Sequence, residues 1–208
     1  YGDPNGWNPR GLTYQGASTG ALYDGVSSLF GTNGRGGASC DCGVAYALTP
    51  TGDTWTESVL YTFCPQGTCT DGAYPGPVAM DGEGNLFGSA VTFSKKSKPR
   101  SIAFELQNNG GTWSETILHT FCVLHKCADG IYWSSTPFFD TDGNLLGTTS
   151  KGGDGHKDCC GLLFQLTPQG ENSPYTILTS FCEKHDCVDG AQPQTDIVID
   201  ASKNVYGA

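Results

Sequence analysis

A cysteine motif that recurs along the chain is the feature that most restricts its possible folds. The pattern Phe-Cys-x-x-x-x-Cys-x-Asp-Gly begins at Phe63, Phe121 and Phe181, which gives a period of roughly 60 residues. Between the copies the same segments return in the same order: a proline, an apolar strand ending in aspartate, a Gly/Asn turn, a Leu-x-Gly strand and two further strands. A fixed internal period is typical of a repeat protein.

Each repeat contains four short segments with strand character. Asn85 and Asn144 stand in the turns between them, where a tight hairpin requires a positive φ. The 208 residues include 30 glycines, only 15% are charged, and no segment shows a sustained helical period. We therefore predict an all-β, disulfide-stapled fold: a β-propeller-like array of four-stranded antiparallel blades. It forms one domain over 1–208, with about three and a half repeats near 1–70, 71–128, 129–188 and 189–208.

The last repeat contains only its first half. Pro193, Ile197–Asp200 and Asn204–Gly207 correspond to Pro137, Phe138–Asp140 and Asn144–Gly147. We predict that 189–208 forms two strands that begin a fourth blade and dock on the preceding one. Two strands alone are only marginally stable. Further blades or a partner chain are expected to complete the structure, and a head-to-tail homo-oligomer is one way to do so.

Ten cysteines in a chain of this length favour disulfides and an oxidising compartment. The motif predicts the pairs Cys64–Cys69, Cys122–Cys127 and Cys182–Cys187. Cys40, Cys42, Cys159 and Cys160 are also expected to be bridged, and the sequence leaves open whether they pair locally or across repeats. Zinc is the alternative, because His125, His156 and His185 lie near cysteines, but the first copy has no histidine nearby.

These cysteines predict an extracellular or cell-surface location after removal of a signal peptide preceding Tyr1. No apolar run is long enough to span a membrane. The net charge of -10, with basic residues concentrated only at Lys95–Arg100, disfavours nucleic acid as a partner.

The chain resembles the GloVer tandem-repeat proteins of bacterial cell surfaces over essentially its whole length. The resemblance is carried by Asp-Gly-x-x-Pro, the Gly-Asn-Leu-x-Gly-Thr segment around Asn144, the Gly pairs 36–37 and 152–153, the Leu-Thr-Pro segments 48–50 and 166–168, and the segment Trp55–Phe63. It implies an exported, propeller-like repeat protein without an established catalytic role. The chain departs from the pattern in its added cysteine pairs, in the copy spanning Ser94–Leu106, and in an insertion at Ala17–Asp24.

Aromatic residues near the Asp-Gly corners are the candidate binding residues: Trp7, Tyr74, Tyr132 and Trp133. Aromatic faces flanked by polar side chains bind sugars by stacking and hydrogen bonding. We therefore predict non-catalytic adhesion or glycan binding, with an extracellular glycan or surface component as partner. Inter-blade packing is the alternative role for each aromatic residue. A structural subunit of an extracellular filament is the first alternative function, and a carbohydrate-active enzyme is the second.

Three further patterns favour structural roles. Asp140, Asp142 and Asn144 resemble the opening of a calcium loop, but turn chemistry explains them better, and no cofactor is predicted. Glu57 and Glu115 resemble a glycosidase carboxylate pair, yet they occupy the same position in successive repeats. The four histidines, His119, His125, His156 and His185, share no spacing and are predicted to be solvated loop residues.

Overall fold

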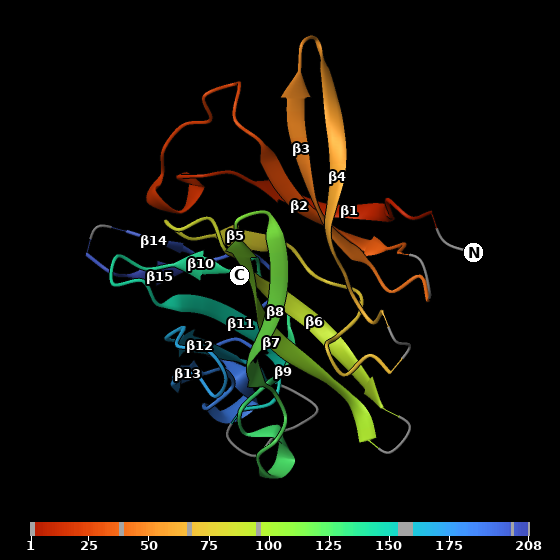
Figure 1. Ribbon diagram of the computed structural model, residues 1–208. Helices are drawn as coiled ribbons and strands as arrows, with labels where there is room; N and C mark the ends of the chain where they lie inside the picture. Colours follow the sequence, from red (N-terminus) through yellow and green to blue (C-terminus); the bar gives the residue numbers. More distant parts are fainter. Residues whose placement is uncertain are drawn as a thin grey trace. The chain divides into compact units, whose positions relative to one another are not determined.

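The computed structural model describes residues 3–37, 40–65, 68–94, 97–153, 160–200 and 202–207, and they form an all-β fold (Figure 1). The chain divides into two compact units. One contains Tyr1–Pro99 and Phe104–Ile117, and the other contains Arg100–Ala103 and Leu118–Ala208. The described helices are single 3-10 turns, at η1 (Ala17–Thr19), η2 (His125–Cys127) and η3 (His185–Cys187). None of the described helices is long and apolar enough to cross a bilayer.

Within the described residues, four sheets follow one another along the chain. The first contains β1 (Trp7–Thr13), β2 (Leu29–Arg35), β3 (Val44–Thr51) and β4 (Thr54–Thr62), in that order. The second contains β5 (Val78–Met80), β6 (Leu86–Ser94), β7 (Ser97–Asn109) and β8 (Thr112–Thr120), in that order. The third contains β10 (Phe138–Phe139), β11 (Leu145–Lys151), β12 (Leu162–Leu166) and β13 (Tyr175–Ser180), and the fourth pairs β14 (Val198–Ile199) with β15 (Val205–Tyr206).

These sheets confirm the prediction of an all-β fold with four-stranded repeats. In each of these sheets the order of the four consecutive strands in space follows their order in the chain, so each strand pairs with the one that follows it. The third sheet has one strand more than predicted, because β9 (Ile131–Trp133) also pairs with β11. β10 contacts the first two residues of β11 and β9 contacts later ones, so two short strands share one edge of β11.

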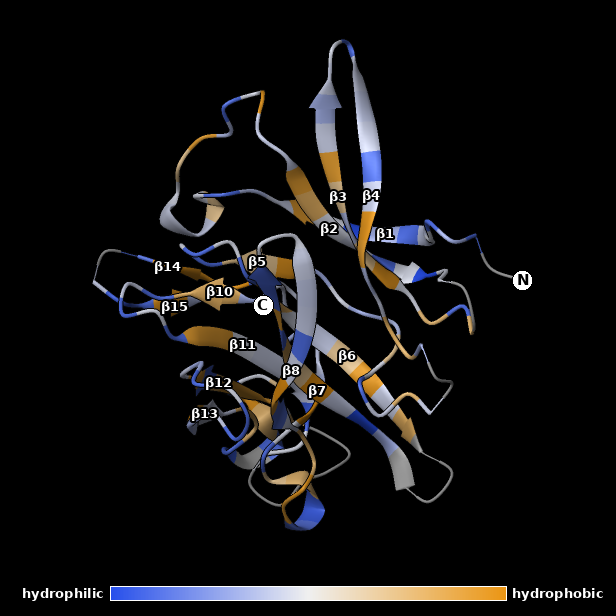
Figure 2. Ribbon diagram, in the orientation of Figure 1, coloured by the Kyte–Doolittle hydropathy of each residue, from blue (hydrophilic) through white to orange (hydrophobic). Residues whose placement is uncertain are grey.

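The glycine of each Leu-x-Gly strand lies against an aromatic ring on the next strand. A Cβ atom on Gly88 would approach the Phe104 ring to 2.7 Å, and one on Gly147 would approach the Phe164 ring equally closely. Real Cβ atoms do not approach this closely, so the glycine makes room for the ring within a close-packed core. Figure 2 shows hydrophobic segments in β5, β6 and β11.

The motif aspartate caps the loop that contains the cysteine pair. Asp71 accepts the Cys64 amide N–H at 3.0 Å, and Asp129 accepts those of Val123 and Leu124 at 2.9 and 3.2 Å. Asp189 accepts the Glu183 amide N–H at 3.0 Å in the third copy. Backbone amides that a loop leaves unpaired thereby gain an ionised acceptor, which explains why aspartate recurs here.

The half repeat forms its two predicted strands. β14 and β15 pair antiparallel, and they pack on the third sheet through a buried cluster of Leu146, Leu163 and Ile197. The Ser134 hydroxyl donates to the Pro193 carbonyl at 2.9 Å. The predicted docking of this segment on the preceding repeat is therefore confirmed.

Candidate functional site

The structure confirms the disulfides predicted from the cysteine motif: Cys64–Cys69, Cys122–Cys127 and Cys182–Cys187. It also settles the first of the two open pairings, since Cys40 bonds locally to Cys42. Cys160 is disulfide-bonded as well, while Cys159 lies outside the described residues. Among the described residues no cysteine is free.

Removing one loop disulfide is expected to lower the free energy of unfolding by about 2 kcal/mol, because a crosslink over a short loop restricts the unfolded chain only modestly. The test is chemical denaturation of the Cys122→Ser/Cys127→Ser variant and the wild type under oxidising conditions. In the presence of a reductant, the difference between the two proteins should vanish. A difference that persists after reduction would show that the serines perturb the fold by another route.

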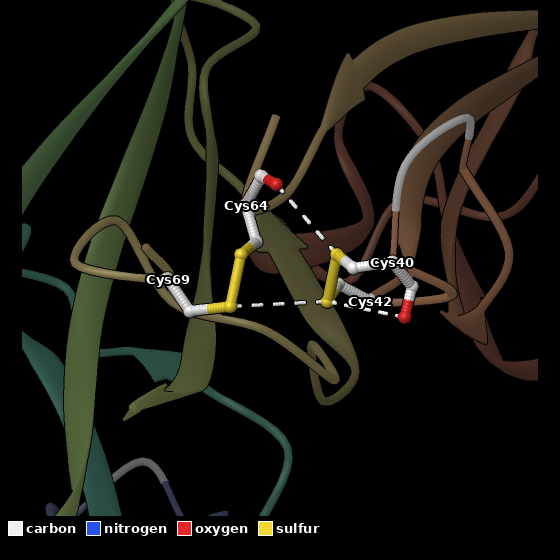
Figure 3. A group of neighbouring side chains, drawn as sticks. All are labelled: Cys40, Cys42, Cys64 and Cys69. Atoms are coloured by element: carbon white, nitrogen blue, oxygen red, sulfur yellow. Dashed lines mark hydrogen bonds between the residues drawn. A yellow bond between two sulfur atoms is a disulfide. The ribbon is translucent and has the colours of Figure 1, made fainter. Parts of the chain in front are cut away.

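Two disulfides form a compact cluster of four sulfur atoms (Figure 3). The sulfurs of Cys40, Cys42, Cys64 and Cys69 all lie within 4.8 Å of one another, and 3.9 Å separates Cys42 Sγ from Cys69 Sγ. Cys42 and Cys64 are buried, together with Ala73. An oxidised cysteine carries no S–H group, so these close approaches are packing contacts as long as the disulfides are intact.

Beside this cluster lies an exposed aromatic surface, which we call the Trp7–Tyr74 surface; it consists of Trp7, Arg35, Asp41, Tyr74 and Phe93. Trp7 and Arg35 are register partners on β1 and β2. The Arg35 guanidinium lies 4.5 Å from the Tyr74 ring centre and 6.0 Å from that of Trp7. Tyr74 also packs against the cysteine cluster and meets Phe93 edge to face. Two of the predicted binding residues, Trp7 and Tyr74, are thus brought together around one cation.

Asp41 fixes the polar part of this surface. Its carboxylate accepts the Gly36 amide N–H at 2.7 Å and the Trp7 indole N–H at 3.1 Å, and it forms an ion pair with Arg35 at 3.5 Å. Trp7 nevertheless remains 54% exposed. The surface therefore presents an open indole face beside a charged donor and a charged acceptor.

The backbone at Tyr74 adopts the left-handed conformation, with φ of 53°. Tyr132 and Gln192, which occupy the same position in the next two repeats, have φ values of 60° and 57°. The amide N–H of Tyr74 donates to the Cys42 carbonyl at 2.6 Å, which stabilises this uncommon conformation. Tyr132 is also exposed, at 48%, and lies in the other compact unit.

The prediction that Trp133 is a loop aromatic is wrong. Trp133 is buried at the end of β9 and packs edge to face against Phe121 and Phe164. Its indole N–H donates to the Ser135 hydroxyl at 3.2 Å. The packing alternative holds for this residue, because the extra strand β9 carries it into the core.

The calcium-like segment forms a turn. The Asp140 carboxylate accepts the amide N–H groups of Asp142 and Asn144, each at 2.8 Å, and the Asn144 side-chain N–H at 2.9 Å. Asn144 Oδ1 accepts the Thr167 hydroxyl, and the Lys203 ammonium lies 2.8 Å from Asp142. Because these oxygens are used by donors of the protein itself, the predicted turn role accounts for all three residues.

The two glutamates of the suspected carboxylate pair have different surroundings. Glu57 is exposed on β4, whereas Glu115 on β8 is partly buried, and its Oε1 atom has no hydrogen-bond partner among the described residues. Burial, followed by the charge of Asp71, raises the pKa of Glu115 to about 8. The negative charge of Glu115 adds to burial in raising the pKa of Tyr61, whose hydroxyl donates to Asp71 at 3.1 Å. Glu115 therefore lies in a partly buried group of polar side chains together with Tyr61 and Asp71.

His119 is not the solvated loop residue that was predicted. It lies on β8, its ring stacks on Tyr175 at 4.1 Å, and its Nε2 is 3.9 Å from Asp129. Burial lowers its pKa and outweighs the opposite effect of Asp129. His125 is exposed, as predicted. His156 and the side chain of His185 lie outside the described residues.

Sequence reasoning singled out neither Arg35, Asp41 and Phe93 nor the convergence of the four sulfur atoms. A scan against protein-family models finds no match for this chain, and a search of curated proteins finds no significant similarity.

Proposed function

We propose that this chain is an extracellular, non-catalytic glycan-binding repeat protein of the GloVer type, and that the Trp7–Tyr74 surface is its binding site. The observation that carries the proposal is the exposed Trp7 ring, which shares the Arg35 guanidinium with Tyr74 and donates its indole N–H to Asp41. An aromatic face stacks on the C–H face of a sugar ring, and a charged donor and acceptor at its edge bind hydroxyl groups.

We also propose that the repeats are blades of a propeller. The same backbone contact between consecutive repeats occurs in both compact units and supports this proposal. Tyr74 donates its amide N–H to the Cys42 carbonyl, and Gln192 donates to that of Cys160, each at 2.6 Å. A Cβ atom on Gly43 would collide with Pro75, and one on Gly161 would come within 2.9 Å of Pro193. A contact that recurs between consecutive repeats is expected of the blades of a propeller.

A binding role explains the chain better than catalysis. Glu115, the carboxyl group with the raised pKa, lies beside Tyr61 and Asp71, and the charges of both carboxyl groups disfavour ionisation of the tyrosine. In the other unit, Tyr175 occupies the equivalent position beside His119 and donates its hydroxyl to the Asp129 carbonyl at 2.9 Å. Glu115 and Tyr175 occupy the same position in two successive repeats. Because the residue type differs between them, this position indicates packing between repeats and not a shared catalytic group.

The test is a binding screen of the purified protein against a panel of polysaccharides. For a glycan that binds, Trp7→Ala should weaken binding about tenfold or more, which corresponds to about 1.4 kcal/mol. Trp55→Ala is the matched control, because Trp55 is similarly exposed, at 46%, but belongs to the β3–β4 hairpin. Equal losses in the two variants, or release of sugar products by the pure protein, would contradict the proposal.

A head-to-tail assembly is the second candidate. Val198 and Tyr206 are register partners on β14 and β15, and they are 61% and 54% exposed. Light scattering should then show wild-type species larger than one chain, and Val198→Asp should shift them toward the monomer by placing a charge at the contact. A wild-type protein that stays monomeric at high concentration would exclude this assembly.

A further inference from the structure

The four clustered sulfurs stand close to the positions that a tetrahedral metal ion requires. With a zinc–sulfur bond of about 2.3 Å, the sulfurs of a tetrahedral site lie about 3.8 Å apart. Cys42 Sγ and Cys69 Sγ, which belong to different disulfides, are already 3.9 Å apart, and no pair in the cluster exceeds 4.8 Å. Opening the two S–S bonds would therefore create the ligand positions with small side-chain movements.

The backbone that holds these cysteines has contacts that do not depend on the disulfides. The Cys64 amide N–H donates to Asp71 at 3.0 Å, and the Cys42 carbonyl accepts the Tyr74 amide N–H at 2.6 Å. Gly43 donates its amide N–H to Gly36 at 3.0 Å and accepts that of Phe63 at 3.1 Å. None of these contacts involves a sulfur atom, so reduction of the disulfides does not by itself remove the hydrogen bonds that hold the two loops next to each other.

The donor set determines which metal fits. Four thiolates without a histidine or carboxylate favour a soft or borderline cation over calcium or magnesium. Cys42 and Cys64 are buried, and Ala73 and Tyr74 pack beside them, which is the closed environment of a structural zinc site. The Arg35 guanidinium, stacked on Tyr74, is a nearby cation that offsets part of the negative charge of a zinc tetrathiolate.

We propose that Cys40, Cys42, Cys64 and Cys69 form a redox-dependent zinc site, with two disulfides in the oxidised chain and a zinc tetrathiolate in the reduced chain. In the reduction, each disulfide takes two electrons and two protons from one dithiol, which itself becomes a disulfide. The four thiols then release four protons as they bind one Zn²⁺. In the reverse direction, two external disulfides each take two electrons from the site and two protons from solvent to become dithiols, while the four cysteines re-form their two disulfides and Zn²⁺ is released. This site does not depend on the proposed glycan binding.

The chain contains its own control for this site. Cys122 and Cys127 form the same kind of motif disulfide, and the equivalent aspartate, Asp129, caps their loop by accepting the amide N–H groups of Val123 and Leu124. Their repeat has no second cysteine pair, because Arg100 stands at the position equivalent to Cys42. Reduction of this loop therefore yields two thiols without partners.

The experiment measures zinc bound by the full chain, reduced anaerobically with a water-soluble phosphine. The phosphine becomes its oxide and supplies two electrons per disulfide, while water supplies the oxygen and the protons. Zinc affinity and stoichiometry come from competition with a chromophoric chelator, and Co²⁺ substitution reports tetrahedral thiolate coordination in the visible spectrum. Cys40→Ser/Cys42→Ser and Cys64→Ser/Cys69→Ser are each compared with Cys122→Ser/Cys127→Ser.

The reduced wild type and the Cys122→Ser/Cys127→Ser variant should bind one more tight zinc ion per chain than either cluster variant. Affinity at this site should fall at least about 100-fold when two ligands are removed. If the reduced wild type unfolds, zinc should restore its β-sheet circular dichroism, and the control variant should recover likewise. Equal zinc binding in all variants, or a reduced wild type that zinc does not refold, would overturn the proposal.

Discussion

Phe121→Ala is expected to lower the free energy of unfolding by about 3–5 kcal/mol, because it leaves a large cavity in the core. Phe121 is fully buried, and its ring packs against four other rings, those of His119, Trp133, Phe164 and Tyr175. These rings come from β8, β9, β12 and β13, so the motif phenylalanine joins strands that are distant in sequence. Urea denaturation followed by circular dichroism measures the loss.

Phe181→Ala is the matched control for this prediction. Phe181 occupies the same motif position in the third copy, but it is only partly buried. Its removal should cost clearly less than the removal of Phe121, since less apolar surface is withdrawn from the core. Equal costs for the two variants would contradict the role of Phe121 as the centre of this aromatic cluster.

The stability of the protein is expected to fall as the pH rises from about 4.5 to about 8, because of Glu115. The folded protein holds the Glu115 proton up to a pKa of about 8, whereas the ordinary value is 4.5. The stabilisation from this protonated carboxyl group is fully present below the ordinary pKa and is lost as the pH rises through the folded-state pKa. We expect a loss of about 2.5 kcal/mol, roughly half of what the full pKa shift gives, because solvent still reaches part of the side chain.

Glu115→Gln removes the titrating group and keeps its shape, so it should flatten the pH dependence over this range. Glu57→Gln changes the equivalent position in the first repeat, where the side chain is exposed, and should leave most of the dependence in place. Free energies of unfolding at a series of pH values from 4 to 9 would decide the matter. An unchanged slope in Glu115→Gln would show that another group causes the pH dependence.

The repeat pattern predicted the four-stranded sheets and the terminal strand pair, but not the additional strand β9. The spacing of the motifs, the Gly/Asn turns and the Leu-x-Gly strands each correspond to a local feature of the structure, and the half repeat formed its two strands where the alignment put them. Local hydrogen bonding explains the agreement, because a hairpin is determined by residues that are neighbours in sequence. The strand β9 was missed, since its pairing with β11 depends on register and not on an alternating pattern.

The candidate sites required the tertiary structure. Trp7 and Arg35 meet because they are register partners, and a shift of one residue would send one of them to the opposite face of the sheet. The sulfur cluster forms because the loop after β2 meets the loop after β4, which no spacing in the sequence reveals. For Trp133 the tertiary structure removes a candidate binding residue. It also follows an Asp-Gly corner, but it lies on β9 and its side chain is buried.

Glycan binding at the Trp7–Tyr74 surface is tested most directly by the indole N–H resonances of the four tryptophans. In a ¹⁵N-labelled sample titrated with the best polysaccharide from the screen, the Trp7 indole resonance should shift, because its N–H donates to Asp41 within the proposed site. The resonances of Trp55, near the end of the β3–β4 hairpin, and of buried Trp133 should stay in place. A titration that moves Trp55 and leaves Trp7 unchanged, or a panel in which no glycan moves Trp7, would contradict the account.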